Sequence, residues 1–310
     1  MKKTLAMMTA AVMVAGALAG CGSSGSTPAA TTAAATEAAT TAAATEAATT
    51  AAATEAATDA ATTEAAGDTT AAAEGTVKTP SGKFTVGFDQ EFPPMGFVGD
   101  DGQFTGFDLD LAKEVASRLG LEFVPQPINW DAKDMELDSG NIDCIWNGFT
   151  MQGREDDYTW VGPYMANNQV FVVTADSDIA SKADLAGKAV EVQKDSSGLA
   201  ALQGEAELSA SFGSMTEVAD YNTALMDLES GACDAVCMDS IVAGYQIKSS
   251  GKDMKILDDT LSAEEYGIGF KKGEDELAKA VYDTLMAMKD DGTVAKISND
   301  WFGSDVFTLK

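Results

Sequence analysis

The sequence predicts an α/β fold made of two successive α/β units. Short apolar strands alternate with amphipathic helices from about residue 84 to residue 146, and the alternation starts again after Tyr164. Such alternation implies parallel strands joined by right-handed crossovers. Residues 22–76, by contrast, contain no Val, Leu, Ile, Met or aromatic side chain with which to form a core. We therefore expect the folded part to comprise residues 77–310.

The individual elements follow from local patterns of apolar residues. In the segment 109–119 the apolar side chains fall on one helical face, and Gly120 ends the helix. The first unit is expected to contain a strand over 84–88, this helix, a strand over 122–128, a short helix over 131–139 and a strand over 142–146. The second unit is expected to contain strands over 169–174, 189–192 and 235–238 and a helix over 217–230. A last amphipathic helix and a helical turn are indicated by Leu277, Val281, Leu285 and Met288 in register and then Trp301.

The N-terminus is typical of an exported lipoprotein. Two lysines precede an apolar run over 5–18 that is too short for a permanent membrane span, and Cys21 follows a Leu-Ala-Gly triplet as in a bacterial lipobox. Residues 1–20 are therefore interpreted as a signal peptide and Cys21 as the lipidated mature N-terminus. The alternative is an ordinary signal peptide followed by a chance cysteine. With no other stretch apolar enough to cross a membrane, we expect the protein to be anchored by lipid at the outer face of the cell membrane.

Residues 21–76 are predicted to form a disordered linker that starts at the lipidated cysteine. Its Ala/Thr-rich repeat has a period of nine residues, marked by Glu37, Glu46, Glu55 and Glu64. Ala favours a helix and the frequent Thr opposes it. A flexible chain of this length has a root-mean-square reach of about 40 Å. The alternative interpretation is low-complexity drift without a function.

The composition excludes several classes of function. Lys and Arg number 20 against 49 Asp and Glu, and the resulting net charge of −29 argues against a nucleic-acid partner. The absence of His from the sequence excludes Ser-His-Asp and Cys-His catalysis and His-ligated zinc or haem. The composition leaves three kinds of function open. They are catalysis by carboxylate, Lys or Tyr side chains, a metal site with oxygen ligands, and binding without chemistry. Three cysteines without a CxxC pattern are interpreted as buried free thiols rather than a redox or metal site: Cys144, Cys233 and Cys237.

Two charged residues lie in segments that follow predicted parallel strands. The chain has only two Arg: Arg118 on the polar side of the first helix, interpreted as a solvated charge, and Arg154 beyond the third strand. Asp239 has the matching place in the second unit. Loops at the carboxyl ends of parallel strands bind ligands in open α/β sheets, and Arg suits bidentate capture of a carboxylate. A cation and an anion on facing units match a zwitterion, although a structural Arg–Asp pair explains the same residues.

Short motifs in a fixed order resemble the family 3 extracellular solute-binding proteins of ABC importers over residues 82–303. The motifs are Val86-Gly87-Phe88-Asp89, Phe92-Pro93-Pro94-Met95-Gly96-Phe97, Gly106-Phe107-Asp108, Ser139-Gly140-Asn141-Ile142-Asp143, Gly148-Phe149-Thr150 with Arg154, Pro163-Tyr164, Asp234-Ala235-Val236 with Asp239, Tyr266-Gly267-Ile268-Gly269, Asp291-Gly292-Thr293 and Trp301-Phe302-Gly303. The resemblance implies a two-lobed periplasmic-binding-protein fold of type II with two hinge crossings, near 166–169 and 261–266. Lobe 1 would comprise 77–166 and 264–310, and lobe 2 would comprise 167–263.

The resemblance also assigns roles to individual residues. Arg154 and Thr150 are expected to bind the α-carboxylate of an amino acid, and Asp239 with the Gly148 carbonyl its α-ammonium. Further contacts are expected from the aromatic walls Phe92 and Trp130, from Asp89 and Asn147, and from the second-lobe loop with Gln193, Ser196 and Ser197. The sequence departs from the family pattern at Asp195, where Gly is common, and at Met238, where some relatives have a polar contact.

The implied function is the capture of a free amino acid, polar or basic, which closure of the lobes buries before a membrane permease takes it over. Glutamate and aspartate are disfavoured because Arg154 is the only candidate cation at the site. No cofactor or metal and a monomeric state are expected. The alternatives are a dehydratase of the cyclohexadienyl type, with Glu91 as proton donor, and a surface adhesin or receptor module.

Overall fold

The computed structural model describes Thr79 and residues 81–310. The predicted signal peptide, the predicted lipidation site Cys21 and the whole of the predicted linker lie outside these residues. Within residues 81–310, no helix combines the length and the apolar character that a membrane span requires.

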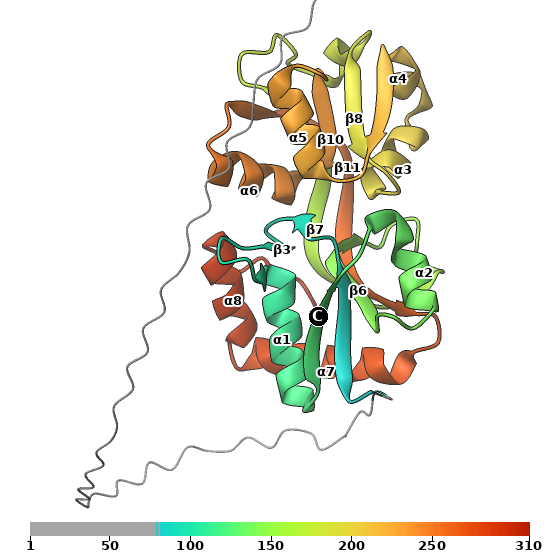
Figure 1. Cartoon of the computed structure of the whole chain (residues 1–310), viewed down its shortest axis with the longest axis vertical. Coiled ribbons are helices and arrows are strands. Elements are labelled where there is room, and N and C mark those ends of the chain that lie inside the picture. Colours follow the sequence, from blue (N-terminus) through green and yellow to red (C-terminus); the bar gives the residue numbers. More distant parts are fainter. Residues whose placement is uncertain (1–78, 80) are drawn as a thin grey trace, which may run out of the picture. The chain divides into compact units, whose positions relative to one another are not determined.

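The described domain is organised around one mixed sheet of eight strands, in the order β5-β1-β6-β11-β7-β10-β8-β9, with a separate sheet of three short strands (Figure 1). The strands are β1 (Lys83–Phe88), β2 (Glu91–Phe92), β3 (Gly96–Val98), β4 (Phe104–Thr105), β5 (Glu122–Pro127), β6 (Cys144–Thr150), β7 (Tyr158–Thr174), β8 (Ala189–Gln193), β9 (Ser214–Val218), β10 (Ala235–Asp239) and β11 (Met254–Lys271). The helices are α1 (Phe107–Leu119), α2 (Lys133–Asp138), α3 (Ser197–Gly204), α4 (Ala206–Ser211), α5 (Tyr221–Ser230), α6 (Ser240–Ser250), α7 (Asp275–Asp290) and α8 (Thr293–Phe302), and the 3-10 helices are η1 (Trp130–Ala132) and η2 (Lys182–Leu185).

Lobe 1 contains β1 to β6 and the helices α1, α2, α7 and α8. Strand β1 pairs in parallel with both β5 and β6, as the strand–helix alternation predicts. Helix α1 buries one apolar face, which includes Leu111 and Val115, and packs against α7 and α8. It ends where Gly120 adopts a left-handed conformation with φ of 70°, which glycine reaches without strain.

Lobe 2 contains β8 to β10 and helices α3 to α6. Strand β8 pairs in parallel with β9 and β10, so the second predicted α/β unit is confirmed. The helix predicted over 217–230 is wrong in its first part, because 217 and 218 belong to β9. Helix α5 starts at Tyr221, where the Asp220 carboxylate accepts a hydrogen bond from the Thr223 N–H at 2.8 Å and caps the helix.

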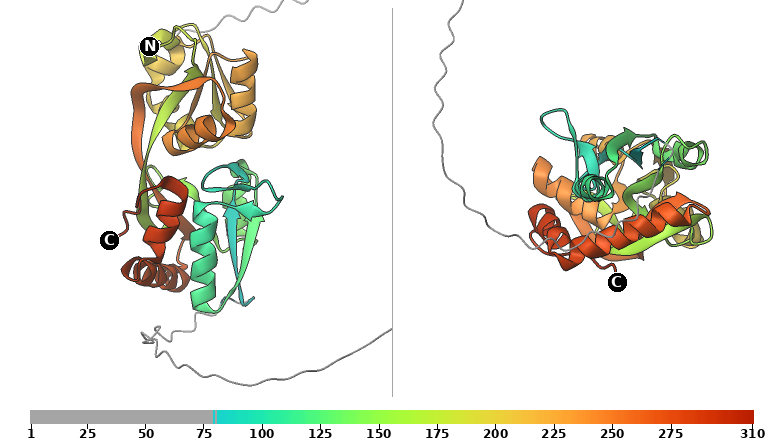
Figure 2. Two further views of the ribbon diagram at one scale, coloured as in Figure 1. Left: turned by 90° about the vertical axis from the view of Figure 1, so that its left-hand side faces the viewer. Right: turned by 90° about the horizontal axis from the view of Figure 1, so that it is seen from below.

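Two long strands, β7 and β11, pair antiparallel along most of their length and run through both lobes (Figures 1 and 2). β11 pairs with β6 of lobe 1, and β7 pairs with β10 of lobe 2. The predicted crossings over 166–169 and 261–266 fall within these strands. The sequence pattern detects only their most apolar part, since the middle of each strand is rich in polar residues.

Three further expectations concern residues outside the site. Cys144, Cys233 and Cys237 are buried free thiols, as predicted. Arg118 is not simply a solvated charge, because its guanidinium forms ion pairs with Glu114 at 2.8 Å and with Asp291 at 2.6 Å, and so ties α1 to the start of α8. The short helix expected over 131–139 is split into η1 and α2.

Candidate ligand-binding site

A cavity of about 720 Å³ opens between the two lobes at the carboxyl ends of parallel strands, where α/β sheets bind ligands. From lobe 1 its wall is formed by segments that follow β1 and β5, and from lobe 2 by segments at the ends of β8 and β9. The lining residues are Asp89, Gln90, Glu91, Pro127, Ile128, Asn129, Trp130, Asp131, Glu136, Lys194, Glu217, Val218, Ala219 and Asp220. Of the predicted site residues, Asp89 and Trp130 line this cavity.

The cavity wall is strongly acidic, with six carboxylates and the single ammonium group of Lys194, which pairs with Asp131 across the lobes at 2.7 Å. Asp89 is buried, and burial raises its pKa to about 6. Its Oδ2 accepts a hydrogen bond from Gln193 Nε2 of lobe 2 at 2.7 Å, and its backbone N–H donates to Asn147 Oδ1 at 3.0 Å. The predicted residues Asp89, Asn147 and Gln193 therefore lie together.

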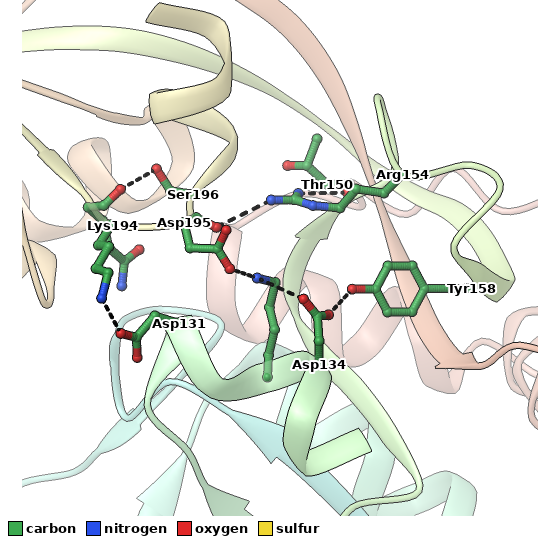
Figure 3. Close-up of polar contacts among 10 residues, drawn as sticks. Asp131, Asp134, Thr150, Arg154, Tyr158, Lys194, Asp195 and Ser196 are labelled. Atoms are coloured by element: carbon green, nitrogen blue, oxygen red, sulfur yellow. Dashed lines mark hydrogen bonds and ion pairs between the residues drawn. The ribbon is translucent and has the colours of Figure 1, made fainter. Parts of the chain in front are cut away.

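Arg154 lies in the turn after β6 and points toward lobe 2 (Figure 3). Its guanidinium donates to the Thr150 carbonyl at 3.2 Å and to the Asp195 carbonyl at 3.4 Å, and it lies 5.1 Å from the centre of the Phe149 ring. It forms no ion pair with any carboxylate of the residues that the structure describes. A structural Arg–Asp pair, the alternative explanation of Arg154, is therefore absent from the described residues. The hydrogen bonds of Arg154 go to neutral carbonyl oxygens instead.

Asp239, at the end of β10, is 3% exposed and belongs to a buried polar cluster at the hinge strands. Its carboxylate accepts from Tyr266 Oη and Asn167 Nδ2, both at 2.7 Å, and from Tyr221 Oη at 3.1 Å. Asn167 Nδ2 also lies 2.6 Å from Oε1 of Glu264, which is 5% exposed. Burial and the neighbouring Glu264 raise the pKa of Asp239 to about 8. Among the described residues this pair of buried acids has neutral donors but no cation.

The loop after β8 contributes two serines with different roles. Ser196 caps helix α3, since its hydroxyl accepts from the Leu199 N–H at 3.1 Å and donates to the Gln193 carbonyl at 2.7 Å. Its side chain is thus committed to the fold. Ser197 Oγ lies 3.2 Å from Thr150 Oγ1 of lobe 1 and 3.1 Å from Gln169 Nε2. Through Gln169, which donates to Glu264 at 2.9 Å, Thr150 and Ser197 are connected to the Asp239 cluster.

The two predicted aromatic walls do not stack on one another in the described domain. The Phe92 ring lies 5.8 Å from that of Tyr221, and the Trp130 ring lies edge-on to Phe149 at 5.6 Å. Gly148 has a φ of 57°, and a Cβ atom there would lie 2.9 Å from the Phe92 ring and 3.1 Å from the Tyr266 ring. Glycine at this position lets Phe92 approach the end of β6.

Several polar residues of the interface between the lobes have no counterpart among the predicted site residues. Lys133 is one of them: it is 2% exposed and pairs with Asp195 of lobe 2. Because Lys194 lines the cavity and Lys133 lies beside Trp130, the expectation that Arg154 is the only cation near the site is wrong. The others belong to the hinge strands and to α5, and are Asn167, Gln169, Glu264, Tyr221 and Tyr266. The sequence signal that could have indicated the hinge residues is the run of polar side chains in the middle of β7 and β11. No group of His, Cys, Asp and Glu within residues 81–310 has the arrangement of a metal site.

Comparison with known proteins gives a consistent assignment. Residues 84–304 match the bacterial extracellular solute-binding proteins, family 3. The L-cystine-binding protein TcyJ of Escherichia coli (strain K12) is 32% identical over 231 residues, which cover 73% of this chain and 84% of that protein. The L-cystine-binding protein TcyA of Bacillus subtilis (strain 168) is 32% identical over 229 residues, covering 73% and 83%.

Among solved structures, a substrate-binding protein of an ABC uptake transporter from Streptococcus pneumoniae with bound histidine has a TM-score of 0.71 and 34% identity, and the match covers 74% of this chain and 96% of that one. The chain belongs to family 3 of the bacterial extracellular solute-binding proteins, and its fold is the two-lobed type II fold of periplasmic binding proteins. These relatives are binding proteins, which supports the expectation of a binding protein over that of a dehydratase with Glu91 as the acid.

Proposed function

We propose that this protein captures a free amino acid between its lobes and delivers it to the permease of an ABC importer, while a lipid on Cys21 holds it at the outer face of the cell membrane. Its relatives named above bind cystine and histidine, and an ancestral arginine-binding protein of known structure is 36% identical, with a TM-score of 0.67 and a match that covers 72% of this chain and 99% of that one. We expect the linker over 21–76 to let the binding domain move above the membrane.

One observation carries the proposal. Lobe 1 holds a guanidinium, that of Arg154, with no carboxylate partner in the described domain, and lobe 2 holds a buried carboxylate, that of Asp239, with no cationic partner there. The zwitterionic end of an amino acid supplies what each lacks. We assign the α-carboxylate to Arg154 with Thr150 and Ser197, and the α-ammonium to Asp239 with the Gly148 carbonyl.

Capture is proposed to work by closure about β7 and β11. Direct contacts between the lobes then hold the ligand in place, among them Gln193 to Asp89 and Lys194 to Asp131, each at 2.7 Å. Because closure removes both ligand charges from water, each has to be matched by a charged or hydrogen-bonding partner. Closure is therefore favourable only when an amino acid supplies both charges.

The ligand side chain is proposed to point into the acidic cavity, with Trp130 as an apolar wall and Asp89 as a polar contact. Asn147, which accepts from the Asp89 N–H, and Phe92 are proposed as further ligand contacts outside the lining of this cavity. Six carboxylates against one ammonium group favour a neutral polar or a cationic side chain. Histidine, arginine and the second amino-acid half of cystine all satisfy this condition, since each brings a donor or a cation.

A thermal-shift screen of the purified chain against the twenty amino acids and L-cystine tests the proposal, because a ligand that binds only the folded state raises the melting temperature. We expect a shift with at least one polar or basic amino acid, or with cystine, and none with glutamate or aspartate. A shift with sugars or peptides but with no amino acid would contradict the proposal.

A further inference from the structure

The interface between the lobes contains a buried cation whose role the proposed function does not explain. Lys133, the first residue of α2, is 2% exposed, and its Nζ lies 5.5 Å from the centre of the Trp130 ring. Trp130 in turn lies against Phe149, on whose ring Arg154 also packs. Lys133 and Arg154 therefore flank the same pair of aromatic rings, of which Trp130 lines the cavity assigned to the ligand.

Lys133 is paired with Asp195 of lobe 2. The other carboxylate near it, that of Asp134, lies 3.8 Å from Nζ and accepts a hydrogen bond from the Tyr158 hydroxyl. Asp195 is thus the main partner of a lysine ammonium group that has almost no contact with water. A buried ammonium group without such a partner would attract another anion.

Asp195 is held in an unusual backbone conformation to make this contact. Its φ of 56° lies in the left-handed region, where no other non-glycine residue of the described domain is found. A side chain in this region costs free energy that glycine would not. The Asp195 carbonyl also accepts from Arg154 at 3.4 Å, so a single residue of lobe 2 contacts both Lys133 and Arg154.

We propose that Asp195 is a specificity-determining residue: its carboxylate occupies Lys133 and thereby excludes amino acids whose side chain carries a net negative charge, which are glutamate and aspartate. The inference rests on the proposed function, since it assumes that an amino acid binds with its α-carboxylate on Arg154. Glutamate would bring its second carboxylate toward an acidic cavity, where Lys194 is already paired with Asp131 and Lys133 with Asp195. Without the Asp195 carboxylate, Lys133 becomes the cation that receives it.

The test compares L-glutamate with its neutral isostere L-glutamine by calorimetric titration of the parent chain and of two variants. Asp195→Asn removes the charge and retains a residue that tolerates the left-handed conformation, and Asp195→Gly removes the side chain and the strain. We expect the affinity for glutamate relative to glutamine to rise by roughly tenfold or more in both variants, because the buried Lys133 ammonium group loses its anionic partner. Adding Lys133→Met to Asp195→Asn should cancel the gain.

Asp283→Asn is the control, since it also removes one carboxylate from an ion pair with a lysine, here Lys279 on α7, and neither residue lines the cavity. An equal gain for glutamate in this control would show that the effect comes from net charge, and would overturn the assignment. If L-arginine or L-histidine binds every variant but glutamate gains nothing in either Asp195 variant, the inference is wrong and the proposed function stands. If no amino acid binds the parent or any variant, the proposed function fails, and the inference fails with it.

Discussion

Replacing Asp239 with asparagine should weaken ligand binding and stabilise the ligand-free protein at the same time. In the complex, the neutral amide of Asp239→Asn would leave the buried α-ammonium without its anion. Removing one partner of a buried ion pair costs about 3–5 kcal/mol, which corresponds to a loss of roughly 150-fold to 5,000-fold in affinity. The amide keeps nearly the same shape, so this loss reports the charge.

The effect on the ligand-free protein has the opposite sign. Asp239 has a pKa of about 8 in the folded protein against an ordinary value of 3.8, so at pH 7 the folded state binds a proton that the unfolded state does not. About three pH units at 1.36 kcal/mol each make a penalty of about 4 kcal/mol. The asparagine removes this penalty and gives up one hydrogen bond of about 1 kcal/mol, so the free energy of unfolding should rise by up to about 3 kcal/mol.

Urea unfolding and calorimetric titration with L-arginine, L-histidine and L-cystine measure the two effects. Glu191→Gln is the control, because Glu191 is also a buried acid of lobe 2 with a raised pKa but lies outside the Asp239 cluster, and we expect it to leave affinity within about twofold. Unchanged affinity in Asp239→Asn would refute the assignment of the α-ammonium. A loss of affinity accompanied by clear destabilisation of the ligand-free protein would show that Asp239 acts through the fold.

Three further predictions concern the ligand carboxylate, pH and the membrane anchor. Arg154→Lys should lower the affinity for every amino acid by roughly a hundredfold, since a single ammonium group cannot reproduce a bidentate contact. The melting temperature of the ligand-free protein should stay nearly unchanged. Equal calorimetric affinities of parent and variant would argue against Arg154 as the binding partner of the α-carboxylate. Ligand affinity should rise as the pH increases from 6 to 8, because the α-ammonium needs an ionised Asp239, whose pKa burial and Glu264 raise to about 8. The release of this proton on binding should appear as a difference in binding enthalpy between two buffers. An affinity that does not change with pH would contradict this prediction. Cys21→Ser should release the protein from the membrane fraction, and continued fractionation with membranes would count against lipidation.

The alternation of strands and helices could be predicted because burial dictates it. Apolar runs such as 84–88 and 235–238 have to be covered on both faces, and a helix such as 109–119 has one apolar face. The segment at 217 and 218 was misassigned because β9 is an edge strand with mostly exposed residues, which carries no periodic apolar signal.

Arg154 and Asp239 could be located for a simple topological reason, since each follows a buried strand at the edge where the lobes meet. Lys133 could not, because its burial depends on Asp195, which lies 62 residues further along the chain in the other lobe. Nothing within a window of local sequence distinguishes Lys133 from an exposed lysine. The same holds for Glu264, whose neighbours in β11 include exposed polar residues.

The central claim is that both charges of an amino acid are recognised, one in each lobe. The most direct measurement is calorimetric titration of the purified chain with L-arginine, L-histidine and L-cystine, each compared with its α-methyl ester and its Nα-acetyl derivative, with both halves of cystine modified. The methyl ester removes the negative charge assigned to Arg154, and the acetyl group removes the positive charge assigned to Asp239. Our account predicts that at least one of the three amino acids binds and that either modification lowers its affinity by roughly a hundredfold or more. A derivative of either kind that binds within a few-fold of its parent amino acid would contradict it.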